Sequence, residues 1–314
     1  MNYLGIDLGG TNIAVGVVDD SFQIIARAKR KTHVPCSPDE MCNQLAETAL
    51  EALGKAGLTV RDIPWVGIGT PGTVNRDTGT VEYSNNLYFR DLKLQKLLSE
   101  KLGRKVIIEN DANAAAFGEY KAGALRGAKN ALAITLGTGV GSGIIIDGKI
   151  YSGSNFAGGE MGHTVIVAGG RQCTCGRKGC WEAYASATGL IAMTRESMQA
   201  HPESAMWKIA GSLENVDGRT AFDAMRTDDG DGKAVVDQYL YYLACGLINC
   251  INTFQPDILC IGGGISNEGD NILKPLREYI AKENYASQSK KQTVLCRAQL
   301  GNDAGIAGAA LLGI

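Results

Sequence analysis

The chain has 314 residues, enough for about two domains at roughly 150 residues each, and this length excludes a short binding module. Lys plus Arg number 31 and Asp plus Glu number 33, a formal net charge of −2 without any basic run, so we expect no nucleic-acid partner. The opening MNYLGID lacks a signal-peptide pattern and no run of about 18 uncharged apolar residues occurs, which predicts a soluble protein with no membrane partner.

The chain opens with two predicted strands joined by a glycine turn. An apolar run, the sequence DLGGTN and a second apolar run fill residues 3–20. The pattern returns 128 positions later, where Leu4, Ile6, Leu8, Gly9 and Asp19 correspond to Leu132, Ile134, Leu136, Gly137 and Asp147. This predicts a duplicated β-hairpin, because a solenoid would repeat every 20–50 residues or so. Two similar halves would face each other across a cleft.

Between the hairpins, helices alternate with buried strands. Ser37-Pro38-Asp39-Glu40 forms a predicted capping box, and apolar residues at helical spacing follow as far as Gly57. Residues 65–72 and 105–110 are each predicted to be a strand running into a loop. A helix over 111–125 follows at once, which places Asp111 at a strand end and beside a helix N-terminus.

The second half continues the alternation. We expect a long helix over 233–254, a strand running into a triple glycine over 258–264 and a small-residue helix over 304–312. Strands that alternate with helices predict an α/β fold. Residues 195–232 are the least informative. Their DDGDG fails the spacing of a calcium loop, because Leu240 stands at the twelfth position, and is interpreted as a solvated helix cap.

Three glycine turns follow predicted strands. Glycine lets backbone N–H groups approach phosphate, Thr adds a donor, and a carboxylate can hold Mg²⁺ through water. The residues so interpreted are Asp7, Gly9, Gly10 and Thr11, then Thr138 and Gly139, then Gly262, Gly263 and Gly264. A Rossmann turn fits worse, since DLGGTN leads into a strand, and no Walker sequence occurs. Each turn alone could be an ordinary tight turn, but three together favour a nucleotide site.

The nine Cys are an odd number that fits a disulfide scaffold poorly, and they indicate a reducing cytoplasm. Cys173, Cys175 and Cys180 crowd together downstream of His163. Three thiolates and one imidazole predict a closed, structural zinc site. The alternative is a loop of reduced cysteines. The other six are interpreted as core residues, namely Cys36, Cys42, Cys245, Cys250, Cys260 and Cys296.

Polar residues near this loop suit a sugar. A sugar needs several acceptors for its hydroxyls and one carboxylate that takes a proton from the attacking hydroxyl. Asn110, Asp111, Glu160 and Glu182 are the candidates, with Asp111 as the base. Asp111 could instead be only a helix N-cap, and the two Glu could be solvated surface residues.

These motifs resemble those of the ROK family of sugar kinases and repressors, in the actin-like, hexokinase-type ATPase superfamily. The resemblance covers essentially the whole chain, through DLGGTN (7–12), GIGTPG (67–72), ENDANAAAFGE (109–119), LGTGVGSGII (136–145), GGEMGH (158–163), CTCGRKGCWE (173–182) and PDILCIGGGI (256–265). The cysteine motif is the most specific. Within the family the chain looks most like bacterial glucokinases.

The resemblance implies two α/β domains around a cleft. We expect a smaller N-terminal domain of residues 1–109 plus 302–314 and a larger domain of residues 110–301 with the sugar site and zinc loop. It also implies that Asn110, Asp111, Glu160, His163 and Glu182 hold the sugar, and that the three turns hold ATP with Mg²⁺. The implied reaction transfers the γ-phosphoryl of ATP to the 6-hydroxyl of glucose, with Asp111 as the general base.

Several alternatives stay open. The substrate could be N-acetylmannosamine, N-acetylglucosamine, allose or fructose, with the choice set by loops near Gly72, Asn86 and the zinc loop. A non-catalytic sugar-sensing regulator is less expected, because the ATP motifs and Asp111 are intact. Polyphosphate could replace ATP as the donor. The resemblance also implies a homodimer or homotetramer, for which Tyr239, Tyr241 and Tyr242 are candidate interface residues, with core packing as the alternative.

Overall fold

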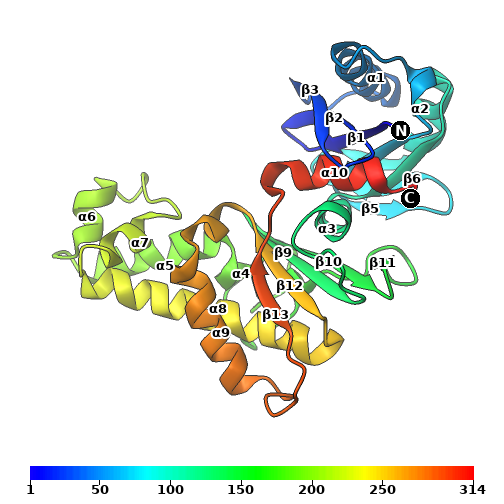
Figure 1. The fold of residues 1–314 in the computed structure, drawn as a ribbon. Coiled ribbons are helices and arrows are strands. Elements are labelled where there is room, and N and C mark those ends of the chain that lie inside the picture. Colours follow the sequence, from blue (N-terminus) through cyan, green and yellow to red (C-terminus); the bar gives the residue numbers. More distant parts are fainter. The chain divides into compact units, whose positions relative to one another are not determined.

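A computed structural model describes all residues, 1–314, and shows a fold of both strands and helices (Figure 1). The strands are β1 (Tyr3–Leu8), β2 (Asn12–Val18), β3 (Ile24–Lys31), β4 (Val66–Thr70), β5 (Thr73–Asn75), β6 (Thr80–Ser84), β7 (Phe89–Leu92), β8 (Val106–Asn110), β9 (Ala131–Leu136), β10 (Val140–Ile146), β11 (Lys149–Tyr151), β12 (Ile258–Gly262) and β13 (Val294–Arg297). The helices are α1 (Pro38–Lys55), α2 (Leu94–Leu102), α3 (Asp111–Ala122), α4 (Glu182–Ala185), α5 (Ala187–Ala200), α6 (Ala205–Ala210), α7 (Thr220–Met225), α8 (Gly230–Phe254), α9 (Asp270–Glu283) and α10 (Ala304–Leu311).

The chain divides into two compact units. Unit 1 consists of Met1–Ala133, Gly143–Gly159 and Ala298–Ile314, and unit 2 consists of Ile134–Ser142 and Glu160–Arg297. The C-terminal helix belongs to the same unit as the N-terminal strands. The bounds differ from the expected division at residue 110, because α3 and the outer parts of the second hairpin belong to unit 1. The physical reason is that α3 packs tightly against α10, so a boundary between them would cut through a core.

The predicted hairpin duplication is confirmed. β1 and β9 begin at residues 3 and 131, and β2 and β10 begin at 12 and 140, so the offset is 128 in both cases (131 − 3 and 140 − 12). One five-stranded sheet has the order β3-β2-β1-β4-β8 and the other has the equivalent order β11-β10-β9-β12-β13. The two halves therefore repeat a topology as well as a sequence pattern.

In the first sheet, β1, β4 and β8 run parallel, so their carboxyl ends meet at one edge. The register pairs Asp7 with Gly69, and Gly69 with Glu109. Parallel strands present their following loops along the same edge, where ligands of open α/β sheets bind. The first glycine turn and the Asn110-Asp111 pair consequently belong to one edge of unit 1.

Helix α10 is made of small residues because it touches its neighbours backbone to backbone. It lies beside α3 in unit 1 (Figure 1). A Cβ on Gly308 would stand 1.6 Å from the carbonyl oxygen of Ala114, and one on Gly118 would stand 2.3 Å from that of Ala304. This close approach joins the last helix to the helix that begins at Asp111.

Gly308→Ala is expected to destabilise the protein, because its methyl group would overlap backbone that cannot move aside. Overpacking of this kind costs about 1–3 kcal/mol or more. Gly54→Ala is the matched control, since Gly54 is also helical but has no atom within 4 Å of the position that a Cβ would take, and it should gain about 0.5–1 kcal/mol. Thermal unfolding of both variants tests this, and equal melting temperatures would contradict the described packing.

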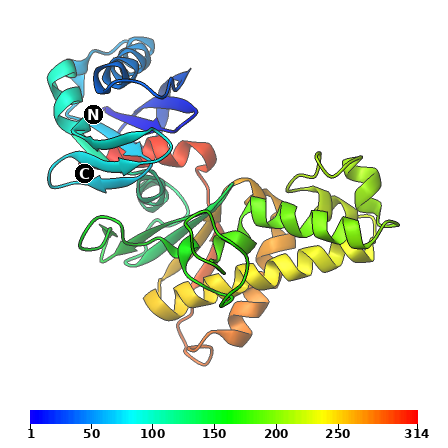
Figure 2. The same cartoon turned by 180° about the vertical axis from the view of Figure 1, so that it is seen from behind.

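Helix α8 is the long core helix of unit 2 (Figure 2). Length and composition alone would allow it to cross a membrane, but 61% of its most apolar window is buried inside the protein, where the helix packs against α4, α5, α7 and α9. Trp181 is fully buried on it and donates its indole N–H to the Tyr242 carbonyl at 3.0 Å. The helix therefore fills a core.

Two predicted caps are confirmed. Ser37 and Glu40 form both halves of the capping box of α1. Asp229 caps α8 by accepting a hydrogen bond from the Gly232 N–H, so DDGDG begins a helix, as interpreted.

Candidate active site

The Asn110-Asp111 pair lies where β8 passes directly into α3. Asn110 is the N-cap, and its Oδ1 accepts from the N–H groups of Ala112 and Asn113 at 2.9 and 3.2 Å. Asp111 is the first helical residue, and its Oδ1 accepts from the Ala112 N–H at 2.9 Å. The alternative that Asp111 is only the N-cap is therefore wrong, because Asn110 takes that position.

Two carboxylates of unit 1 influence each other. Burial, and then the charge of Asp111, raises the pKa of Asp7 from 3.8 to about 6. Burial also raises the pKa of Asp111, while its hydrogen bond from the Ala112 N–H opposes that shift. Both side chains are half-buried. Two partly desolvated carboxylates that repel each other suit a site that receives a cation or a proton.

Asp7→Asn is expected to stabilise the fold above pH 6. Because the pKa of Asp7 is higher in the folded than in the unfolded chain, its favourable contribution is full below pH 3.8 and lost as the pH rises through about 6. The difference between a pKa of 3.8 and one of about 6 corresponds to roughly 3 kcal/mol. The stability difference between variant and wild type, measured by urea unfolding from pH 4.5 to 8, should grow up to about pH 6 and then stay constant. A difference independent of pH would contradict this.

The first glycine turn, between β1 and β2, is closed by backbone hydrogen bonds, and its Thr11 side chain is exposed to solvent. The Gly9 N–H donates to the Asn12 carbonyl at 2.9 Å, and the Thr32 hydroxyl donates to the Gly9 carbonyl at 2.7 Å. A Cβ on Gly10 would lie 3.1 Å from the Asn86 carbonyl oxygen, while Thr11 is exposed. Glycine is the residue that best allows this close approach at position 10.

Unit 2 brings the other two glycine turns together. Gly263, at φ 88°, would place a Cβ 2.2 Å from the carbonyl oxygen of Leu136, the last residue of β9. The turn after β9 is also held from the start of α5, where the Ala187 N–H donates to the Gly137 carbonyl at 2.9 Å and the Thr188 hydroxyl donates to the Thr138 carbonyl at 2.8 Å. These turns are adjacent, as a single phosphate site requires.

The four predicted zinc ligands converge in unit 2. The ligand atoms of His163, Cys173, Cys175 and Cys180 all lie within 4.8 Å of one another. Nδ1 of His163 lies 3.6 Å from Sγ of Cys173, and the Sγ atoms of Cys175 and Cys180 are 3.6 Å apart. Three thiolates and one imidazole at these distances fit a tetrahedral zinc ion. None of the nine cysteines is in a disulfide, and of the other six, Cys42, Cys250 and Cys260 are buried while Cys36, Cys245 and Cys296 are half-buried.

The two predicted sugar carboxylates differ. Glu160 is exposed and begins the short turn that carries His163. Glu182 is half-buried, and its Oε2 accepts from the Val140 N–H at 3.0 Å while its Oε1 accepts from the Thr174 hydroxyl at 3.3 Å. Glu182 thus connects the cysteine loop to the glycine turn before β10. A solvated surface role for Glu182 is wrong.

The predicted residues form two groups. Unit 1 holds Asp7, Gly9, Gly10, Thr11, Asn110 and Asp111, and unit 2 holds Thr138, Gly139, Glu160, His163, Cys173, Cys175, Cys180, Glu182, Gly262, Gly263 and Gly264.

Two further residues, Glu109 and Arg76, were not predicted. They form an ion pair beneath Asn110, with 2.9 Å between Nη1 and Oε2. The signal that could have found them was a Glu at the end of an otherwise apolar strand.

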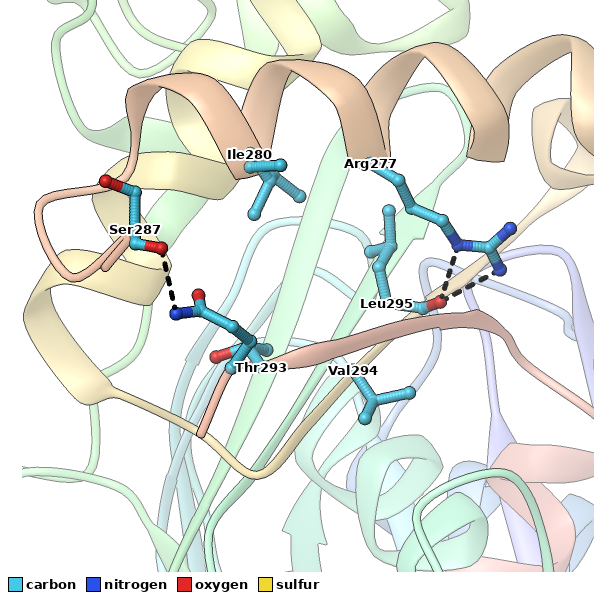
Figure 3. Close-up of a pocket in the computed structure, with 8 residues that line it drawn as sticks. Arg277, Ile280, Ser287, Thr293, Val294 and Leu295 are labelled. Atoms are coloured by element: carbon cyan, nitrogen blue, oxygen red, sulfur yellow. Dashed lines mark hydrogen bonds between the residues drawn. The ribbon is translucent and has the colours of Figure 1, made fainter. Parts of the chain in front are cut away.

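A separate pocket of about 340 Å³ lies in unit 2 between α9 and β13 (Figure 3). The Arg277 guanidinium points across it and donates to the Leu295 carbonyl at 3.1 and 3.3 Å. Gln292 donates to three carbonyls of its own loop. Arg277 and Gln292 at this pocket are thus engaged in internal hydrogen bonds, and none of the predicted site residues line it.

A sequence profile of the ROK family matches residues 3–314. The chain is 38% identical to a glucokinase of Thermotoga maritima over 312 residues, which are 99% of this chain and 96% of that relative. The solved ROK glucokinase of Streptomyces griseus, in complex with glucose and AMPPNP, matches with a TM-score of 0.81 and 34% identity, over 99% of this chain and 98% of that one. A ROK hexokinase from Thermus thermophilus matches with a TM-score of 0.82 and 32% identity, over 99% and 97%. These matches confirm the expected actin-like α/β fold, and with residues 3–314 covered by one family profile the chain belongs to the ROK family.

Proposed function

We propose that this enzyme is a glucokinase, which transfers the γ-phosphoryl group of ATP to the 6-hydroxyl of glucose. The observation that carries the proposal is Asp111, a half-buried carboxylate of raised pKa at the β8–α3 junction, in a chain with full-length similarity to glucokinases. Phosphoryl transfer needs alignment and charge stabilisation more than covalent chemistry from the protein. Asp111 orients the 6-hydroxyl and takes its proton.

The other proposed sugar contacts come from one amide, two carboxylates and one imidazole. Asn110 lies next to the base, and Glu160, His163 and Glu182 flank the cysteine loop. Nδ1 of His163 faces the cysteine sulfurs, so Nε2 is the ring nitrogen left to meet a sugar hydroxyl. Carboxylates and an imidazole can each bind vicinal hydroxyls, which makes this set suited to a hexose.

The three glycine turns hold ATP. Backbone N–H groups at Gly10, Gly139 and Gly263 lie in turns where no Cβ blocks a phosphate, and the Thr11 and Thr138 hydroxyls are exposed donors. Asp7 would hold Mg²⁺ through water, and a bound Mg²⁺ would neutralise charge on the β- and γ-phosphates. The repulsion between Asp7 and Asp111 is relieved when a cation binds beside Asp7.

A structural zinc ion would be held by four side chains of unit 2, those of His163, Cys173, Cys175 and Cys180. The sulfur-rich donor set and its convergence support this assignment. A closed site of four protein ligands leaves no position for a reacting group, so the metal acts by fixing the loop that carries His163 and by orienting Glu182.

The enzyme acts in the cytoplasm as a homodimer or homotetramer. Nine cysteines without a disulfide suit a reducing compartment. Of the three tyrosines predicted for an interface, Tyr239 is fully buried and donates its hydroxyl to the Ala185 carbonyl at 2.8 Å. Tyr239 is therefore a core residue. Tyr241 is 47% exposed and lies against Tyr242 and Tyr279, with ring centroids 5.9 and 6.1 Å away. It is the residue proposed for the subunit contact.

ADP release in parallel reactions with glucose, N-acetylmannosamine, N-acetylglucosamine, allose and fructose tests the proposal, with polyphosphate as an alternative donor. Glucose with ATP is expected to give the highest kcat/KM. A higher value with another hexose would keep the kinase reaction and overturn the substrate. Absence of turnover with every sugar and both donors would overturn the kinase proposal itself.

A further inference from the structure

A buried carboxylate, that of Glu109, lies two residues before the proposed base. Glu109 is the last-but-one residue of β8 and only 1% exposed, and it immediately precedes Asn110. A carboxylate at such a depth is costly unless it is paired and hydrogen-bonded. Burial raises the pKa of Glu109, and the nearby Arg76 cation is the largest opposing influence. The fold therefore retains a charge here that it must compensate.

The two oxygens of Glu109 have different partners. Oε1 accepts from the Asn110 backbone N–H at 2.8 Å and from Asn113 Nδ2 at 3.1 Å, so it fixes the N-cap and the first turn of α3. Oε2 lies 2.9 Å from Nη1 of Arg76 without a well-aligned hydrogen bond, so this contact is an ion pair. One oxygen orients the peptide next to Asp111, and the other receives the neutralising cation.

Arg76 connects three separate segments of unit 1. It begins the turn between β5 and β6, and its Nη2 donates to the hydroxyl of Ser152, just after β11, at 2.8 Å. The same small sheet reaches Asn110 directly, since Asn110 Nδ2 donates to the Gly72 carbonyl at 3.2 Å, one residue before β5. The guanidinium fork thus joins the β5–β6 turn and the segment after β11 to the strand end that carries the base.

We propose that Arg76 and Glu109 are positioning residues for phosphoryl transfer, which hold Asn110 and Asp111 at the angle needed for reaction with the sugar hydroxyl. This inference rests on the proposed function. A misplacement of about 1 Å by a residue away from the chemistry can cost about 100-fold in rate. Loss of the cation should therefore impair sugar turnover more than it impairs ATP binding, because Arg76 is paired with Glu109 and Ser152 and with no residue of the three glycine turns.

The test compares Arg76→Met, Glu109→Gln and the double variant. Arg76→Met is expected to lower kcat/KM for glucose by about 10- to 100-fold, with KM for ATP within a factor of about two of wild type. The double variant should recover most of the loss, because a Gln oxygen still accepts from the Asn110 N–H and Asn113, and no buried charge is left unpaired. Arg90→Met is the control, since Arg90 is an exposed residue of the same small sheet that lies over Tyr83.

Circular dichroism melting and glucose titration calorimetry separate positioning from folding. All assays are run well below the melting temperature of the weakest variant. If Arg76→Met melts earlier yet keeps the wild-type kcat/KM for glucose, the pair only supports the fold and the inference is overturned. It is also overturned if the double variant is no better than Arg76→Met. A wild-type enzyme inactive on every hexose would instead overturn the proposed function, and the positioning role with it.

Discussion

Asp111→Asn is expected to reduce kcat by about 10²- to 10⁴-fold, which corresponds to roughly 3–5 kcal/mol of additional barrier. Asn has nearly the shape of Asp, and its amide oxygen can still accept the hydrogen bond that Oδ1 takes from the Ala112 N–H at 2.9 Å. It cannot take a proton from the 6-hydroxyl. The local fold is further secured because Asn110, not Asp111, caps α3. The expected defect is therefore chemical, with glucose affinity close to that of wild type.

Steady-state kinetics and calorimetric titration of glucose measure the two quantities separately. Asp39→Asn is the matched control, because Asp39 is also an acidic residue in the first turn of a helix, but it is exposed and belongs to α1. It should leave kcat unchanged. If glucose affinity fell in Asp111→Asn as far as kcat did, Asp111 would contribute to binding and not specifically to the proton transfer.

The duplicated hairpins could be predicted because their signal is local. Each is an apolar run, a glycine turn and another apolar run, and the repeat shows the same pattern twice, independently. The same holds for α1, where a capping box and a Pro in the first turn fix the N-terminus. For such elements a few adjacent residues are sufficient for the prediction.

Other elements lacked local signals. Helix α9 begins after Gly269 without a side-chain cap and contains Pro275 in its interior, which from sequence argues against a helix. Strands β5, β6 and β7 are only three to five residues long, so an alternation of apolar and polar residues cannot be recognised in them. Their stability comes from tertiary packing, which composition does not reveal.

The site was predictable in its chemistry but not in its pairings. Asp7 and Asp111 were singled out separately, and only the register of β1, β4 and β8 shows that they act on each other across 104 positions (111 − 7). The link from Glu182 to Val140 also depends on tertiary structure. Residue types indicate which kind of ligand a site binds. To predict which distant residues lie close together, the order of the strands in the sheet must also be known.

Cys180→Ala is expected to abolish binding of the proposed zinc ion and to weaken glucose binding by at least about 10-fold, the scale on which support around a metal ligand acts. Cys180 is fully buried, and its Sγ lies 3.6 Å from that of Cys175. Without the metal, the loop no longer holds His163 and Glu182 in place. Because structural zinc contributes directly to folding free energy, the melting temperature should fall as well. Metal content by mass spectrometry, melting temperature and glucose affinity are the measurements.

Cys250→Ala supplies the control, because Cys250 is equally buried in unit 2 but lies in α8, outside the cluster. It loses the same thiol from a packed interior and should keep both zinc and glucose affinity. Treatment of the wild type with a zinc chelator should reproduce the Cys180→Ala defect, and added zinc should reverse it. If Cys180→Ala retained wild-type zinc, the four side chains would not be the ligands. If it lost zinc and still bound glucose normally, the metal would support the loop without ordering the sugar site, since His163 would then reach the sugar unaided.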